Sequence, residues 1–194
     1  MQFTRYTEAD RAQEPITLER AKAHLRVIDD SEDDLLRAYI AAARAHVEAH
    51  CGIRLIAATV TAYGAKLPAG GQSITLPVAP VLSVASVETL AEGAEDYAAL
   101  DADDFRHLEG SNRVQLDANF ASQSLAARDD AVRIIYTAGY GADAGKTPAS
   151  LVTALLFLVA HYFENRVPVV IGASAVELPL GVQSLLRPFK QIQV

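Results

Sequence analysis

Apolar residues recur at helical spacing early in the chain. In residues 18–27 one face carries Leu18, Ala21 and Leu25. The preceding residue is Thr17, whose hydroxyl can accept a hydrogen bond from a backbone N–H of the first turn. We therefore predict a short helix over residues 18–27, which the polar run 29–31 ends.

A longer segment with the same spacing follows. Ser31 is the predicted N-cap, and three acidic residues come directly after it. The apolar positions then fall mostly three and four apart: Leu35, Leu36, Tyr39, Ile40, Ala43 and Val47. Gly52 suits the left-handed conformation that ends many helices. The pattern predicts a helix over residues 32–51, and its alanine-rich run 41–45 would let another helix or another subunit approach closely.

In the middle of the chain the period changes from that of helices to that of strands. Strand-like segments rich in β-branched residues are separated by turns that contain Gly and Pro. Residues 109–112 are typical of a hairpin turn. Strands are predicted over residues 59–63, 73–76, 81–90, 105–108, 113–116 and 132–137.

The last third of the chain begins with a segment that is apolar nearly all round, residues 149–165. Pro148 starts this predicted helix at a position where its missing N–H costs nothing. A helix without a polar face is buried, either in the core or by neighbouring subunits. Pro168 is expected to stop it. In the apolar tail, 167–194, a short helix is predicted over 180–186, and the tail either covers the chain's own core or docks onto a partner.

These elements predict an α+β fold. The expected architecture is a small helical core, with three main helices and a C-terminal short helix or tail, and an inserted small β domain. The helical core would comprise residues 1–54 and 142–194, and the β unit residues 55–141. A chain of 194 residues is long enough for a sizeable core, since it buries roughly 70% of its unfolded surface.

Composition and charge narrow the function classes. The net charge is -7, whereas a protein that wraps tightly around DNA needs a surplus of Lys and Arg. The first 15 residues lack the apolar centre of a secretory signal, and the longest apolar runs are too short for a membrane span. Cys51 is the only cysteine, which excludes an intrachain disulfide. These features indicate a cytosolic protein that does not insert into membranes.

One stretch has a spacing that could hold a metal: His46, Glu48, His50 and Cys51. Two histidines four residues apart share a helical face. However, the order H-x-E-x-H differs from the H-E-x-x-H of zinc proteases, and no second Cys/His cluster supplies further ligands. Solvent-facing histidines explain the pattern better. A small metal-dependent enzyme that uses His46, His50 and Cys51 is kept as an alternative hypothesis.

Two further groups could suggest chemistry. His161 lies close to Glu164, but no serine or cysteine nucleophile occurs in a recognisable elbow. The acidic run 101–104 lacks the central Gly and terminal Glu of a calcium loop. The sequence therefore predicts no enzyme, with no catalytic residue, no metal and no cofactor.

Three stretches occur together in a familiar order. The first is ITLERAKAHLR at 16–26, the second combines DDLL at 33–36 with IAAAR at 40–44, and the third is YTAGYG at 136–141, followed by Pro148 and AHYFENR at 160–166. In this order and spacing they resemble the head–tail connector (adaptor) proteins of tailed phages, in the longer branch that carries a β insertion between its second and third helices. The resemblance covers about residues 16–166, and prophages and gene transfer agents contain similar adaptors.

The resemblance implies a structural protein that forms a ring, expected to be a dodecamer, between the portal and the tail of a phage-like particle. The implied partners are further copies of the chain, the portal protein, the next tail-proximal component (a stopper or a tail terminator) and DNA that passes without specific binding. The protein would be made in the bacterial cytoplasm and would lie at the particle neck. Twelve copies would carry 12 × -7 = -84 charges, so an acidic lumen would repel DNA and keep it mobile.

The resemblance also implies that the C-terminal segment reaches toward the portal. The residues expected to contact the portal are Leu178, Leu180, Leu185, Leu186, Arg187, Phe189 and Lys190. Faces of the second and third helices are expected to contact neighbouring subunits. Truncation after Arg166 is expected to leave a folded protein that no longer joins heads to tails. A cytosolic binding module without a phage connection is a further alternative.

Overall fold

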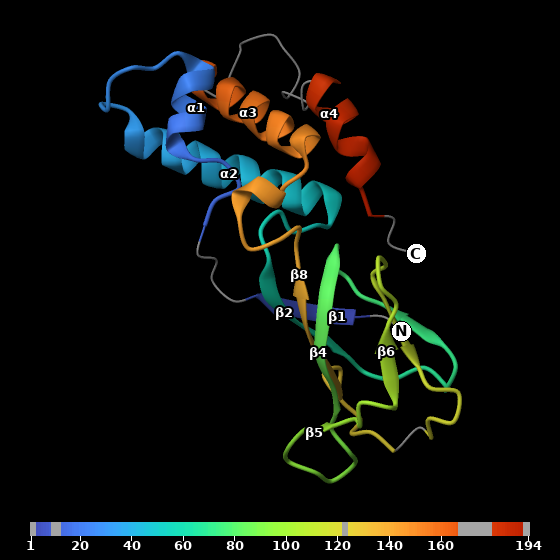
Figure 1. Cartoon of the computed structure of the whole chain (residues 1–194). Coiled ribbons are helices and arrows are strands. Elements are labelled where there is room, and N and C mark those ends of the chain that lie inside the picture. The colour runs from blue at the N-terminus through green and yellow to red at the C-terminus, as the bar shows by residue number, and fades with distance from the viewer. Residues whose placement is uncertain (1–2, 9–12, 122–123, 167–179, 192–194) are drawn as a thin grey trace. The chain divides into compact units, whose positions relative to one another are not determined.

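The computed structural model describes residues 3–8, 13–121, 124–166 and 180–191 (Figure 1). Within it the chain divides into two compact units, a helical unit made of residues 12–56 and 141–192 and a β unit made of residues 1–11 and 57–140. Each unit is described by itself. The mixture of helices and antiparallel sheets confirms the predicted α+β class.

The helical unit follows the predicted order of elements (Figure 1). Its members are α1 (Leu18–Leu25), α2 (Asp33–Cys51), the 3-10 helix η1 (Ala144–Lys146), α3 (Ala149–Glu164), α4 (Leu180–Leu186) and the 3-10 helix η2 (Arg187–Phe189). Thr17 caps α1 as predicted, because its Oγ1 accepts a hydrogen bond from the N–H of Arg20 at 3.2 Å. Gly52 ends α2 with a φ of 68°.

The start of α2 differs from the prediction. Glu32, not Ser31, is its N-cap residue, and no side chain caps the helix there. The Ser31 hydroxyl instead donates a hydrogen bond to the carboxylate of Asp29 within the preceding loop. A short polar side chain can bond to a nearby loop group as readily as to a helix N–H, and here the loop contact prevails.

The core of the helical unit lies between α2, α3 and α4. One face of α2 is buried, through Leu36, Ile40, Ala43, Val47 and Cys51. On α3 six residues are buried, Leu151, Val152, Ala154, Leu155, Leu158 and Val159, which form the inward face of this apolar helix. Among the described residues of α3, Phe157 is the exposed large apolar side chain, at 43%, and its ring lies 6.1 Å from that of His24 on α1.

The β unit contains two antiparallel sheets. The larger has the strand order β1-β2-β8-β4-β5 and the smaller β3-β7-β6. The strands are β1 (Phe3–Glu8), β2 (Ala58–Gly64), β3 (Ser73–Thr75), β4 (Val81–Thr89), β5 (Ala98–Ala99), β6 (Phe105–His107), β7 (Arg113–Leu116) and β8 (Val132–Ala138). The predicted hairpin is present, since β6 pairs with β7 in the register Phe105↔Leu116.

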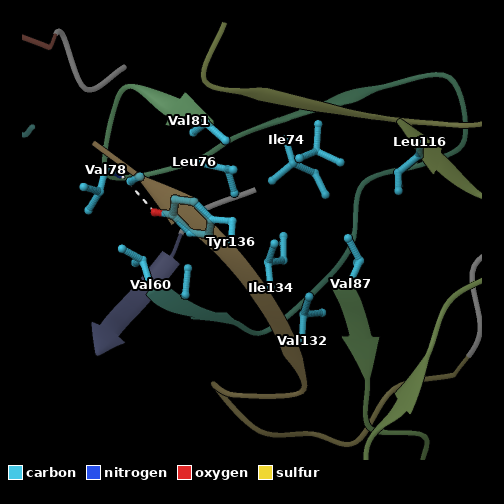
Figure 2. Packing of buried hydrophobic residues seen from close by; sticks show 13 residues of the cluster. Val60, Ile74, Leu76, Val78, Val81, Val87, Leu116, Val132, Ile134 and Tyr136 are labelled. Atoms are coloured by element: carbon cyan, nitrogen blue, oxygen red, sulfur yellow. Dashed lines mark hydrogen bonds between the residues drawn. The ribbon is translucent and has the colours of Figure 1, made fainter. Parts of the chain in front are cut away.

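The two sheets share one apolar core (Figure 2). Alternate residues of β8 point into it, so that Val132, Ile134 and Tyr136 are fully buried. The hydroxyl of Tyr136 accepts a hydrogen bond from the backbone N–H of Val78 at 3.3 Å, which satisfies a polar group inside the core. The period-2 alternation of the sequence thus decides which side chains fill the β unit.

Two strands lie outside the predicted set, β1 and β5. The prediction placed residues 1–54 with the helices, whereas β1 pairs with β2 in the sheet of the β unit. Its sequence, FTRYTE, is too polar to signal a buried strand, and its backbone hydrogen bonds are made with a strand more than 50 residues away in the chain.

No helix in the described part of the chain combines the length and the hydropathy needed to cross a membrane.

Candidate docking surface

The C-terminal elements α4 and η2 contain most of the residues that the sequence assigned to portal contact. Leu186 is 0% exposed and packs with Val182 in the helical unit. The Sγ atom of Cys51 on α2 donates a long hydrogen bond, of 3.9 Å, to the carbonyl oxygen of Leu186. The side chain of Leu186 therefore stabilises the chain's own core and is not displayed to a partner in this conformation.

The other predicted contact residues differ in exposure. Leu180 is 80% exposed, and Arg187 and Lys190 are exposed as well. Leu185 and Phe189 are half-buried. Leu178 lies outside the described residues. Of the predicted contact residues that the structure describes, the exposed ones are therefore one apolar side chain, Leu180, and two cations, Arg187 and Lys190.

Burial of α4 also changes the expectation for truncation. Removing the chain after Arg166 would remove Val182 and Leu186, and it would expose the apolar side chains of α2 and α3 that they cover. Lost burial of this kind destabilises a protein by about 2–5 kcal/mol per large side chain. The structure therefore argues against a folded truncated protein, and point variants are the better test of docking.

The segment after η2 is held against the end of α2. The N–H of Gln191 donates a hydrogen bond to the carbonyl oxygen of Cys51 at 2.8 Å. A Cβ built on Gly52 would lie 3.4 Å from the Cβ of Gln191, so the two backbones are in close contact. Lys190 is thereby held near the C-terminal end of α2.

His46 and His50 lie on the exposed surface of the same end of α2. Their ring centroids are 6.4 Å apart, and the two ring planes are nearly parallel, with an angle of 21° between them. Partial burial, the charge of Lys190 and the charge of His46 together lower the pKa of His50 below its ordinary value. The shift indicates that Lys190 and His50 interact electrostatically, although they belong to different elements.

The described residues at this end of α2 do not form a metal site. Among them, no three His, Cys, Asp or Glu side chains gather closely enough to hold an ion. Cys51 is 1% exposed and points into the helical core, and burial raises the pKa of its thiol. Cys51 is a core residue, and it lies on the buried face of the helix that displays the two histidines.

The other candidate groups make local contacts. The Nδ1 atom of His161 lies 3.3 Å from the side-chain nitrogen of Asn165 at the end of α3. In the acidic run 101–104, Asp104 accepts a hydrogen bond from the N–H of Asp101 at 3.3 Å within a turn. These contacts are local, one at a helix end and one within a loop.

Comparison with known proteins identifies the kind of molecule that has this fold. Residues 15–87 match the model of the family described as phage gp6-like head–tail connector protein. A chain in the neck of an empty GTA particle, computed with C6 symmetry, is 26% identical with a TM-score of 0.78, over 98% of this chain and 97% of that one. The resemblance to head–tail connectors is confirmed.

Two further structures from gene transfer agent particles have a similar fold. A chain from the virion of a native gene transfer agent (GTA) particle is 24% identical with a TM-score of 0.74, over 97% of this chain and 96% of that one. A chain in the neck of a native GTA particle, computed with C12 symmetry, is 24% identical with a TM-score of 0.63, over 97% of both chains. None of the curated proteins matches the chain.

The sequence assigned faces of α2 and α3 to contacts between neighbouring subunits, and the two helices display different side chains there. On α2 an exposed stripe consists of alanines spaced three and four apart: Ala38, Ala42, Ala45 and Ala49. On α3 the side chains that are not buried include Thr153, Leu156 and Phe157. Both stripes are uncharged, which is the composition that the centre of a protein interface favours.

Proposed function

We propose that this chain is a structural head–tail connector, with no catalytic activity, that forms a ring between the portal and the tail of a phage-like particle. The observation that carries the proposal is the likeness over 98% of the chain to a protein in a particle neck. The neck relatives were computed with sixfold and twelvefold symmetry, which supports a ring of identical copies. The expected ring is a dodecamer.

A ring requires each copy to present two different surfaces to its neighbours. Cyclic assemblies use such head-to-tail contacts, and the closed ring leaves no unpaired surface. The uncharged stripes of α2 and α3 are the surfaces that we assign to these contacts. DNA would pass through the lumen without specific binding, and the protein would be made in the bacterial cytoplasm before it reaches the neck.

The end of the chain is assigned to the portal. Of the predicted contact residues, Leu180, Arg187 and Lys190 are exposed, so these side chains are the ones that can reach a portal without unfolding of α4. The opposite face of the ring would receive a stopper or a tail terminator. No arrangement of the described residues favours the metal-dependent enzyme or the cytosolic binding module over this proposal.

The decisive experiment is removal of the chain from particles followed by complementation. Particles without it are expected to have filled heads without tails, and the wild-type chain should restore tailed particles with a ring at the neck, visible by electron microscopy. Leu180→Glu should fail to restore them, because a charge replaces an exposed apolar contact. The matched control is Ile28→Glu, at an apolar residue that is 95% exposed on the same unit. Tailed particles in the absence of the chain would refute the proposal.

A further inference from the structure

Four basic or titratable side chains of the helical unit belong to two segments that meet at the C-terminal end of α2. His46 and His50 come from α2, and Arg187 and Lys190 come from η2 and the residue after it. All four are exposed. The electrostatic influence of Lys190 on His50 and the hydrogen bond between Gln191 and Cys51 place the two elements side by side. We call these four residues the basic face.

Several other cations of the helical unit have acidic partners. Lys22 pairs with Asp30 and Asp33, and the guanidinium of Arg166 pairs with Glu32 at 2.6 Å. In the part of the chain that the structure describes, neither Arg187 nor Lys190 forms such a pair.

Among the described residues, the charged groups that act on His50 include no acidic side chain. His50 is near Lys190 and His46, and the thiol of Cys51 is buried and protonated. Glu48, on the same helix, is 3% exposed and directed inward, where it accepts a hydrogen bond from the N–H of Leu55 at 3.0 Å and pairs with Arg44. The basic face is thus a positive surface without a counter-charge of its own.

We propose that the basic face binds an acidic segment of the portal, with His46 and His50 as additional contact residues beside Arg187 and Lys190. The inference rests on the proposed docking function and adds to it the charge of the partner surface. Charge complementarity identifies the partner surface, because an acidic segment supplies the counter-charges that the chain itself lacks at this place. The backbone contact between Gln191 and Cys51 holds the cations in position before binding, which reduces the entropic cost of docking.

A protein segment fits this surface better than the DNA that passes the neck. Binding to the phosphate backbone requires a stripe of many Lys and Arg residues, and the basic face has two permanent cations. Its neighbours Leu185 and Phe189 are half-buried apolar side chains, which suit the mixed polar and apolar contacts of a protein interface.

If an acidic segment docks beside His50, its binding should be coupled to protonation of this histidine, and this coupling can be measured. In the free chain, partial burial, Lys190 and His46 disfavour the charged form of His50 and lower its pKa. An acidic segment would favour that charged form, so docking would take up protons. Affinity for the portal should therefore rise as the pH falls through the range in which histidines titrate.

The test measures binding of the full-length chain to purified portal rings at pH 8 and pH 6, with fold checked by circular dichroism. The wild-type affinity is expected to rise about tenfold at the lower pH, as for one or two new charge contacts. The double variant His46→Gln/His50→Gln should bind with little pH dependence, while His24→Gln, on α1, should retain the wild-type response. Lys190→Glu should weaken binding about tenfold at low salt, and Lys146→Glu, at an exposed lysine of η1, should not.

Several results would overturn the inference. Wild-type binding that is independent of pH, or equally dependent in the double histidine variant, would show that the imidazoles do not contact the portal. Loss of ring formation with portal binding intact in Lys190→Glu would assign the face to a neighbouring copy, and reduced DNA retention alone would assign it to DNA. If the wild-type chain does not bind portal rings at either pH, the proposed docking function itself fails.

Discussion

Glu48 shows how one buried side chain joins several parts of the helical unit. Its Oε1 atom accepts a hydrogen bond from the N–H of Leu55 at 3.0 Å. Its Oε2 atom lies 3.4 Å from Arg44, whose Nε donates to Glu14 at 2.7 Å. The network therefore connects the segment before α1, the helix α2 and the segment after it. The sequence placed Glu48 between two histidines, but its role is that of a buried acceptor.

Glu48→Ala is expected to destabilise the chain by about 3 kcal/mol, because it leaves the buried N–H of Leu55 and part of the half-buried guanidinium of Arg44 without their partner. Glu48→Gln should cost about 1–2 kcal/mol, since its carbonyl oxygen can still accept from Leu55. Urea unfolding followed by circular dichroism measures both. A Gln variant as unstable as the Ala variant would show that the hydrogen bond to Leu55 contributes little.

Cys51 provides a probe of the same region. The thiol is 1% exposed and burial raises its pKa, so the reactive thiolate is scarce in the folded chain. At pH 8 a thiol reagent is expected to label the native chain about 100-fold more slowly than the urea-unfolded chain, because labelling requires the helical unit to open. Rapid labelling of the native chain would contradict the burial of Cys51 by α4.

At the scale of elements, α4 depends on its surroundings. A helix of seven residues is unstable in isolation. Val182 and Leu186, four residues apart, lie on one face and are fully buried, whereas Leu180 faces outward. Contact with α3, and with Cys51 at the end of α2, therefore stabilises α4, and α4 in turn completes the core of the helical unit.

Leu186→Ala is expected to lower the free energy of unfolding by about 2–5 kcal/mol, the usual cost of a cavity at a buried leucine. Leu180→Ala is the matched control within the same helix, and it should change stability by less than about 0.5 kcal/mol, as exposed sites do. Denaturant unfolding of the three proteins tests the difference. Equal effects of the two substitutions would mean that α4 is not docked in solution. The Leu186 variant should also accelerate labelling of Cys51.

At the scale of the whole molecule, the negative charge is unevenly divided. The β unit has 7 basic and 13 acidic residues, a net charge of 7 − 13 = -6, and the rest of the chain has 10 and 11, a net charge of -1. Between Glu88 and Asp104 there are seven acidic residues and no basic one. If an acidic surface keeps DNA mobile in the lumen of a connector, the β unit is the part of the chain that supplies it.

Neutralising exposed acids of the β unit should therefore slow DNA delivery. The residues to change to Asn or Gln are Glu92, Glu95, Asp96, Asp101 and Asp103, all exposed. Particles with this variant are expected to assemble normally but to release DNA more slowly, with the largest effect at low salt, where repulsion is least screened. Release kinetics of labelled DNA measure this, and unchanged kinetics at low salt would argue against a lumen lined by these residues.

The sequence alone determined where most helices and strands lie. Hydrophobic period, caps such as Thr17 and Gly52, and turns of Gly and Pro are local signals, and they predicted α1, α2, α3, α4 and six strands close to their observed bounds. The stretches that resemble head–tail connectors are local too. For the docking surface, the sequence identified the exposed cations Arg187 and Lys190 as candidates.

Only the tertiary structure decided which surfaces are free. The polar strand β1 forms because β2 offers a partner, and Leu186 is buried while Leu180 is exposed because α4 presents one particular face to α3. The proximity of Lys190 to His50 depends on a hydrogen bond between residues 140 positions apart. Local sequence encodes the period of an element, whereas its partner is selected by packing between distant segments, and that selection separates core residues from contact residues.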